Sequence, residues 1–230
     1  KLAAQHGVRA SSAPDAATFE AQLLVLAVKP QDMKAALASV GGTVRGKLVV
    51  SIAAGVRIEA LSRWLGGHAK LVRCMPNTPA LIGAGITALF AAPEVREDEK
   101  AVAEAVLRAV GEVVWVAEER LLDPVTAVSA SGPAYVFWFI EQLAASAVAL
   151  GLEKDTALKL ALHTVLGAAK LAAASSESPE TLRKNVTSKG GTTEAALTVF
   201  DEERIAERFA RALAAASRRG AQLGDELGED

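Results

Sequence analysis

The sequence has little of the chemistry that disulfides and metal sites require. It contains one cysteine, Cys74, and three histidines that lie far apart, His6, His68 and His163. A single cysteine cannot form an intramolecular disulfide, which fits a protein of the reducing cytoplasm. The histidines and the cysteine show none of the short spacings that a zinc site needs. We therefore expect a cytoplasmic protein without a disulfide framework and without a metal.

Charge and hydropathy exclude two further classes of partner. The net charge is -2 and basic residues are spread among acidic ones, so no basic face is expected to bind nucleic acid. No uninterrupted apolar run reaches the roughly 18 residues needed to span a bilayer, and the start does not resemble a signal peptide. Aromatic residues make up only 4% of the 230 residues, whereas small and aliphatic residues are common. This composition suits closely packed helices in one large or two modest domains.

The first half of the chain alternates between strand-like and helix-like patterns. Apolar runs typical of buried strands occupy residues 22–28, 47–52, 70–73, 85–90 and 112–116, and helical patterns occupy residues 31–37, 58–65 and 96–110. Such alternation predicts a doubly wound, Rossmann-like α/β domain over residues 1–118. Ligands of such domains lie at the carboxyl ends of the strands, where Lys29, Ala53, Ala54 and the loop 75–78 are expected.

The glycine-rich phosphate loop that opens a dinucleotide-binding domain is missing from these residues. Gly83-Ala-Gly85 fits part of the motif but precedes a strand and not a helix, so we interpret it as a chance match. Residues 1–7 read as the end of a helix that Gly7 terminates. We expect the first strand, loop and helix to precede Lys1, over on the order of 30 residues.

The second half is predicted to be entirely helical. Strand patterns stop near Asp123, and helices are expected at 133–150, 154–174, 179–186, 192–199 and 202–223, which defines a second domain at residues 119–230. The segment Ala134–Ile140 is apolar on all sides, so it must be buried in a bundle or between subunits, which suggests a homodimer. The acidic tail 224–230 is expected to be solvated.

Two adjacent glycines interrupt this helical half within the stretch 186–194. Gly190 and Gly191 allow close approach to a ligand, and the helix that restarts at Thr192 presents unpaired N–H groups and its positive dipole end. Thr192 and Thr193 add hydroxyls. These features predict a small hollow for an anion, although the same residues would also form an ordinary turn with a threonine cap.

The sequence offers no nucleophile–base pair. Ser131 lies in Ala-Ser-Gly-Pro, which is not the strand-to-helix elbow of a hydrolase, and no histidine stands near as a base. Hydride transfer to a protonated imine needs a cofactor and correct positioning but little acid–base chemistry. The absence of an obvious acid or base is therefore compatible with a reductase.

Five segments in this order stand out, namely Ala27-Val-Lys-Pro30, Ser51-Ile-Ala-Ala-Gly55, Arg73-Cys-Met-Pro-Asn-Thr-Pro79, Asp123 to Tyr135 and Val186 to Thr193. Together they closely resemble one enzyme family, pyrroline-5-carboxylate reductase. The resemblance implies reduction of 1-pyrroline-5-carboxylate to L-proline with NADPH or NADH. It also implies a helical domain that interlocks with a second subunit, and a ring of dimers such as a pentamer of dimers.

Site residues follow from the resemblance by position. Ala27, Val28, Lys29 and Pro30 would border the nicotinamide and its ribose, Ala53 and Ala54 would lie beside the cofactor, and Asn185 and Glu119 are further candidates to touch it. Ser188, Gly190, Gly191, Thr192 and Thr193 would hold the substrate, with backbone N–H groups around Gly190 to Thr192 receiving its carboxylate. The Thr193 Oγ would face the ring nitrogen as the catalytic group. Cys74 is expected to pack, and Asn77 to fix its loop.

Two alternatives stay open at this stage. A hydroxyacid dehydrogenase of related architecture would carry a catalytic lysine on the first long helix of its second domain, but residues 133–152 contain none. A truncated, non-catalytic dimerisation or proline-binding module of the same fold is the other, because the phosphate loop is missing. NADPH titration would separate this module from an enzyme.

Overall fold

The computed structural model describes residues 2–15, 20–40 and 44–228. These residues form two compact units. The sheet unit consists of Lys1–Ser131 together with Ala214–Asp230, and the helical unit consists of Gly132–Leu213. The chain therefore leaves the sheet unit at Ser131 and returns to it near Ala214.

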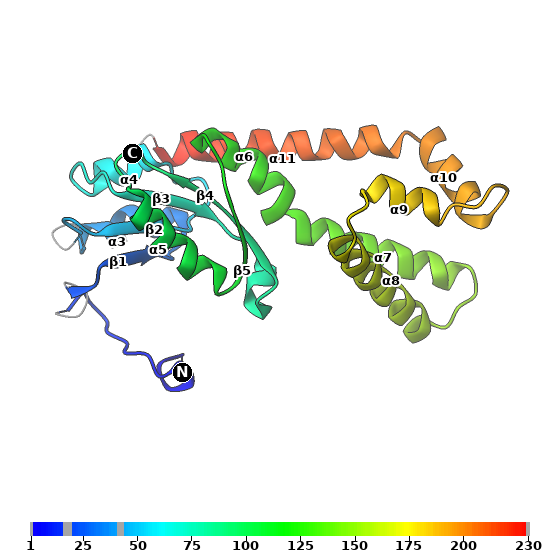
Figure 1. The fold of residues 1–230 in the computed structure, drawn as a ribbon, viewed down its shortest axis with the longest axis horizontal. Coiled ribbons are helices and arrows are strands. Elements are labelled where there is room, and N and C mark those ends of the chain that lie inside the picture. The colour runs from blue at the N-terminus through cyan, green and yellow to red at the C-terminus, as the bar shows by residue number, and fades with distance from the viewer. Residues whose placement is uncertain (1, 16–19, 41–43, 229–230) are drawn as a thin grey trace. The chain divides into compact units, whose positions relative to one another are not determined.

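A five-stranded sheet forms the centre of the sheet unit (Figure 1). Its order is β1 (Leu23–Leu26), β2 (Leu48–Ser51), β3 (Leu71–Met75), β4 (Gly85–Ala91) and β5 (Gly111–Trp115). All five predicted strands are present. The first three strands are parallel, β4 is antiparallel to β3, and β5 is parallel to β4.

The reversal at β4 departs from the predicted doubly wound pattern. A parallel connection needs a crossover of about ten or more residues, usually with a helix. The link between β3 and β4 spans residues 76–84 and contains only the short 3₁₀ turn η3 (Thr78–Ile82), so the chain turns back beside β3. Gly83, with φ 71°, ends η3, and Gly85 begins β4. The glycines of this stretch thus form a turn, and not a phosphate loop.

Helices cover both faces of the sheet. Right-handed crossovers place α3 (Met33–Ala38), which follows η1 (Pro30–Asp32), and α4 (Ile58–Trp64) on one face. The same handedness places α5 (Glu97–Arg108) on the other face, because β4 and β5 run the opposite way. Fully buried side chains between these layers include Met33, Leu37, Leu61, Leu71, Val72 and Leu89. At the start of the chain, α1 (Leu2–His6) ends at Gly7 with φ 64°, as predicted.

The last helix, α11 (Ile205–Gly228), completes the sheet unit with its final turns. Gly224 is buried, Leu227 packs against the core, and a Cβ added to Gly55 would lie 3.0 Å from Leu227 Cδ1. Arg57 Nη2 forms an ion pair of 2.7 Å with Asp225 Oδ1. The prediction of a solvated tail is therefore wrong for Gly224 and Leu227, whereas Asp225 and Glu226 are exposed as predicted. Residues 229–230 lie outside the described ones. The acidic residues of this segment suggested a fully exposed tail, although Gly224 and Leu227 form a face that packs on the sheet unit.

A helical connection leads from the sheet to the helical unit. It comprises η4 (Glu119–Leu121), α6 (Leu122–Val125) and a π-helical segment, η5 (Thr126–Ala130), in which the Ser131 N–H donates to the Thr126 carbonyl at 2.9 Å. The helix widens at this segment, and the hydroxyls of Thr126 and Ser129 donate to carbonyls of the preceding turn, at 2.7 and 3.0 Å.

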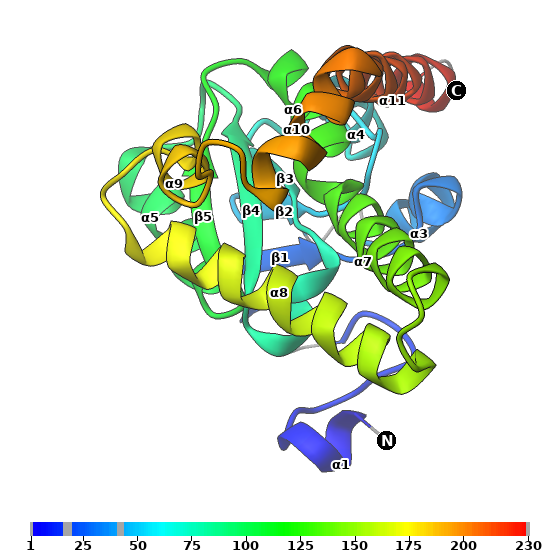
Figure 2. The same ribbon diagram turned by 90° about the vertical axis from the view of Figure 1, so that its right-hand side faces the viewer.

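The helical unit contains α7 (Gly132–Ala149), α8 (Lys154–Ala174), α9 (Pro179–Asn185), α10 (Thr192–Glu202) and the first part of α11. Figures 1 and 2 show α7 and α8 side by side, joined by a turn at Gly151 with φ 98°. Within 132–213, all of which is described, the buried hydrophobic side chains are Ala157 and Ala161. Phe137 and Trp138 are each 60% exposed. The unit on its own therefore has almost no core.

One helix of the described residues, α8, is long and apolar enough to cross a bilayer by length and composition, although the sequence shows no uninterrupted apolar run of that length. A helix at a protein interface passes the same test. Few of its residues are buried within the chain, which adds α8 to the apolar surface of the helical unit.

Candidate active site

The carboxyl ends of β1 and β2 form one part of the predicted site. Ala27, Val28 and Lys29 are exposed, and the Lys29 carbonyl accepts the Asp32 N–H at 3.0 Å at the start of η1, where Pro30 takes the first position. One lysine charge and small neighbours at this edge fit an anionic dinucleotide.

Ala53 and Ala54 contribute differently to this edge. The buried Ser51 hydroxyl accepts the Ala53 N–H at 3.3 Å, and Ala53 is itself 4% exposed within the core. Ala53 is therefore part of the core that supports this edge of the sheet. Ala54 is half-buried. The positive φ of Gly55, 77°, serves a turn that α11 covers, since the added Cβ would meet Leu227.

Asn77 fixes the loop after β3 with two hydrogen bonds. Its Oδ1 accepts the Ile86 N–H at 3.0 Å, and its Nδ2 donates to the Ser129 carbonyl at 3.3 Å. In a helix the Ser129 carbonyl would accept the N–H of Pro133, four residues later, but proline has no N–H. The Asn77 amide supplies the donor instead. The predicted structural role of Asn77 is confirmed.

Glu119, a candidate for cofactor contact, has two partners inside the protein. Its Oε1 lies 3.0 Å from Arg73 Nη1 and also accepts the Ile58 N–H at 2.8 Å, which caps the start of α4. The Arg73 side chain is only 4% exposed, so this carboxylate neutralises a buried charge. Nearby, burial raises the pKa of the Asp123 carboxyl, and the positive charges of Arg73 and Arg57 oppose that shift. The predicted contact of Glu119 with the cofactor stays a prediction.

The glycine turn before α10 has the backbone shape that the sequence predicts. Gly190 adopts φ 72°, and Gly191 is the N-cap of α10 with no side chain to cap the helix. The Gly191 N–H donates to the Ser188 carbonyl at 3.0 Å, and the Gly190 N–H donates to Glu194 Oε2 at 2.6 Å. Both glycine N–H groups are thus satisfied within the turn.

The donors that face outward begin at Thr192, two residues later than the predicted start at Gly190. Thr192 and Thr193 are the first two residues of α10, and the first N–H groups of a helix have no acceptor within that helix. An anion at this N-terminus would therefore meet the N–H groups of Thr192 and Thr193, with two hydroxyls beside them. Ser188 and Gly190 are exposed, whereas Gly191 and Thr193 are half-buried.

Asn185 lies at the end of α9, just before this turn. Its Nδ2 donates to Glu177 Oε2 at 3.1 Å, which joins the two ends of the α9 segment. The following Thr187 donates its hydroxyl to the Arg183 carbonyl at 2.7 Å. The approach to the glycine turn is thus held by local hydrogen bonds.

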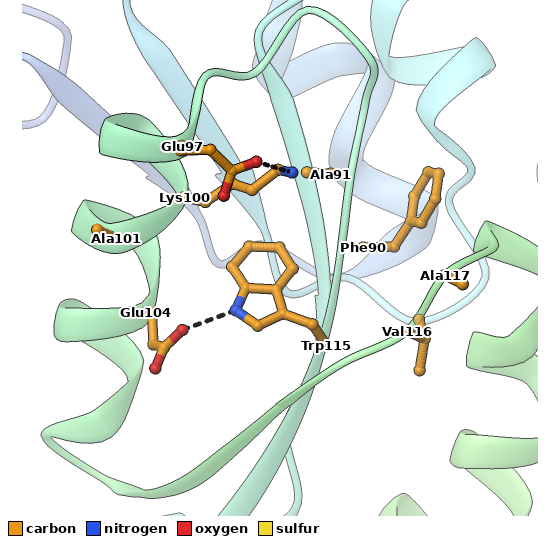
Figure 3. Close-up of a pocket in the computed structure, with 9 residues that line it drawn as sticks. All are labelled: Phe90, Ala91, Glu97, Lys100, Ala101, Glu104, Trp115, Val116 and Ala117. Carbon is orange, nitrogen blue, oxygen red and sulfur yellow. Dashed lines mark hydrogen bonds and ion pairs between the residues drawn. The ribbon is translucent and has the colours of Figure 1, made fainter.

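A hollow lies elsewhere in the sheet unit, between α5 and the ends of β4 and β5 (Figure 3). Trp115 Nε1 donates to Glu104 Oε2 at 2.7 Å, and Lys100 pairs with Glu97 at 2.7 Å. None of the predicted site residues lines it, and its charges have partners. Among the residues that the structure describes, no three His, Cys, Asp or Glu side chains gather as metal ligands.

Comparison with known proteins connects these features. A family model described as pyrroline-5-carboxylate reductase dimerisation matches residues 119–223, and one described as NADP oxidoreductase, coenzyme F420-dependent, matches residues 1–55. The chain is 41% identical over 230 residues to pyrroline-5-carboxylate reductase of Pseudomonas aeruginosa, covering 100% of this chain and 84% of the relative. The chain belongs to the pyrroline-5-carboxylate reductase family.

Solved structures agree with this assignment. A pyrroline-5-carboxylate reductase from Coxiella burnetii matches with a TM-score of 0.92 at 41% identity, over 96% of this chain and 83% of that one. Pyrroline carboxylate reductase of Plasmodium falciparum, solved with NADP bound, matches with a TM-score of 0.82 at 29% identity, over 90% and 79%.

Membership of the pyrroline-5-carboxylate reductase family confirms the predicted family and fold class. The chain is an NAD(P)H-dependent oxidoreductase of proline biosynthesis that reduces 1-pyrroline-5-carboxylate, and its dimerisation domain supports a homodimer. The two groups of predicted site residues belong to separate units. Ala27–Pro30, Ala53, Ala54 and Glu119 lie in the sheet unit, and Asn185 and 188–193 lie in the helical unit.

Proposed function

We propose that the start of α10 binds the carboxylate of 1-pyrroline-5-carboxylate. The observation that carries this proposal is the Gly190–Gly191 turn, which ends in a helix N-terminus that no side chain caps. The N–H groups of Thr192 and Thr193 would hold the two carboxylate oxygens, aided by the helix dipole. Gly191 admits no larger residue easily, because an added Cβ would lie 3.0 Å from the Ser188 carbonyl oxygen.

The strand ends of the sheet unit are proposed to bind the nicotinamide half of the cofactor. Ala27, Val28, Lys29 and Pro30 would border the ring and its ribose, and the backbone at Ala53 and Ala54 would lie beside them. Asn185 and Glu119 are proposed as further contacts. We propose NADPH as the preferred donor, with NADH as the alternative, since a relative was solved with NADP bound.

The reaction needs positioning more than acid–base chemistry. NAD(P)H, when bound, supplies the hydride that forms the new C–H bond at the imine carbon. The π electrons of the C=N bond move to the nitrogen, which already carries the proton, and L-proline and NAD(P)⁺ result. Thr193 Oγ is proposed to face this nitrogen and to orient the ring, while the helix N-terminus fixes the carboxylate.

Substitution of Thr193 tests the assignment. For Thr193→Ala we expect kcat/KM for 1-pyrroline-5-carboxylate to fall about 10- to 100-fold, because a hydrogen bond to the reacting ring is lost. Gly191→Val should be at least as harmful. Thr198→Ala is the matched control, because Thr198 lies on the same helix and donates its hydroxyl to the Glu194 carbonyl at 3.0 Å. Unchanged turnover in both site variants would show that the site lies elsewhere.

Two further proposals concern the oligomeric state and the cellular location of the protein. Homodimers are proposed to assemble into a pentamer of dimers, as the family resemblance implies, and the particle mass in solution tests this. A cytoplasmic location is proposed from the lone, buried Cys74 and the absence of other cysteines in the sequence.

A further inference from the structure

Glu194 is the third residue of α10, and its side chain reaches back toward the start of the helix. Glu194 Oε2 accepts the Gly190 N–H at 2.6 Å. This arrangement is a relative of the capping box, in which a glutamate at the third helical position accepts a backbone N–H ahead of the helix. Here the accepted N–H belongs to the residue before the N-cap.

The bond closes a turn that would otherwise have great freedom. Gly190 adopts a left-handed conformation with φ 72°, and it is exposed. Glycine loses more conformational entropy on ordering than any other residue, so an exposed glycine pair needs a restraint to hold one shape. The Glu194–Gly190 bond and the Gly191–Ser188 bond are the two restraints within this turn.

The bond also decides which donors remain for a ligand. Since the Gly190 and Gly191 N–H groups have internal acceptors, the donors left at the start of α10 are the N–H groups of Thr192, Thr193 and Glu194. The first two of these adjacent donors match the two oxygens of one carboxylate. We propose that Glu194 is a positioning residue that holds the Gly190–Gly191 turn closed and so prepares Thr192 and Thr193 for the carboxylate of the substrate.

This inference rests on the proposed function of the turn, and it separates two properties of Glu194. The hydrogen bond orders the turn and favours substrate binding. The negative charge beside an anion site opposes binding. A glutamine at this position keeps an acceptor oxygen and removes the charge, whereas an alanine removes both.

The test compares Glu194→Ala, Glu194→Gln and the control Glu202→Gln, which removes a carboxylate from the last turn of the same helix. We expect Glu194→Ala to raise KM for 1-pyrroline-5-carboxylate about 10-fold, as for the loss of one charge-assisted hydrogen bond, with an unchanged KM for NADPH. Glu194→Gln should restore KM to the wild-type value or below it. Equal KM in Glu194→Ala and wild type, or equal damage by both substitutions, overturns the proposal.

A second readout does not depend on turnover. In the wild-type protein the Gly190 amide should exchange slowly with solvent, and its NMR resonance should shift in Glu194→Ala but remain near its position in Glu194→Gln. L-proline is the titrated ligand, and Glu194→Ala should weaken its binding. A rapidly exchanging Gly190 amide in wild type overturns the proposal even if a variant fails to fold. If the amide behaves as expected but Thr193→Ala keeps full activity, the proposed substrate site fails and the turn-closing role of Glu194 does not.

Discussion

Burial controls the chemistry of the single cysteine. Cys74 lies on β3, is 1% exposed, and packs in the core of the sheet unit. Desolvation raises the pKa of its thiol to about 12, because a thiolate would lose its hydration there. The residue is therefore a small hydrophobic core residue and not a nucleophile, as predicted.

Cys74 should resist thiol reagents while the protein is folded. At pH 8 we expect no modification by a disulfide reagent until the protein is denatured, when one thiol should react. The raised pKa also makes stability fall as pH rises above the ordinary thiol value, because the unfolded chain releases this proton first. The loss is at most about 1.4 kcal/mol per pH unit and continues up to the folded pKa. Denaturant melts at increasing pH check this, and Cys74→Ala should reduce the decline; fast modification of the native protein would contradict it.

The sequence reveals the roles of some residues of the site but not of others. The glycine pair and the helix start at Thr192 were predictable, because glycine and helix-capping preferences act locally. The partners of Glu119, by contrast, come from β3 and α4 and depend on the folded sheet. Glu194 was missed, although the spacing of a glutamate three residues after the N-cap is a local signal that could have revealed it.

At the scale of elements, the hydrophobic pattern of the sequence predicts whether a segment is a helix or a strand better than it predicts the direction of a strand in the sheet. The strands and most helices were predictable because their hydrophobic periodicity reports burial. The direction of β4 depends on the length of the link before it, residues 76–84, and a loop with two prolines gave no helical crossover. The end of α11 was mispredicted, since its contact with Gly55 joins residues far apart in the sequence.

The end of α11 is expected to contribute stability through Leu227. Replacing Leu227 by alanine removes a partly buried side chain that packs on the core beside Gly55, and should lower the free energy of unfolding by about 1–2 kcal/mol. Denaturant unfolding measures the loss. Gln222→Ala, an exposed change one turn earlier in the same helix, is the control. If both variants are as stable as wild type, the end of α11 does not pack on the sheet unit.

At the scale of the whole molecule, the helical unit needs a partner. Its buried hydrophobic side chains within 132–213 are two alanines, whereas Phe137 and Trp138 on α7 are more than half exposed. Apolar surface of this kind marks an interface. The dimerisation family model covers the same helices, so the second subunit is the occupant that explains the apolar character predicted from Ala134–Ile140.

A charge introduced on the exposed apolar face of α7 should weaken the dimer. For Trp138→Asp we expect the Kd of the dimer to rise about 100-fold, which is a loss of about 3 kcal/mol of association free energy. An aromatic side chain is lost from the interface and a charge is desolvated there. Sedimentation over a dilution series measures the change. Val102→Asp is the control, since Val102 is 49% exposed on α5 of the sheet unit. A Trp138→Asp protein that stays dimeric at the same dilution would place the interface on other residues.

The return of α11 to the sheet unit has a consequence for biosynthesis. The strands of this unit are all made by residue 115, yet Leu227, which covers Gly55, is synthesised more than a hundred residues later. During translation that part of the core therefore stays uncovered until Leu227 has been synthesised. The helical unit, residues 132–213, is synthesised before Leu227, so its apolar surface is already exposed while the core beside Gly55 is still uncovered.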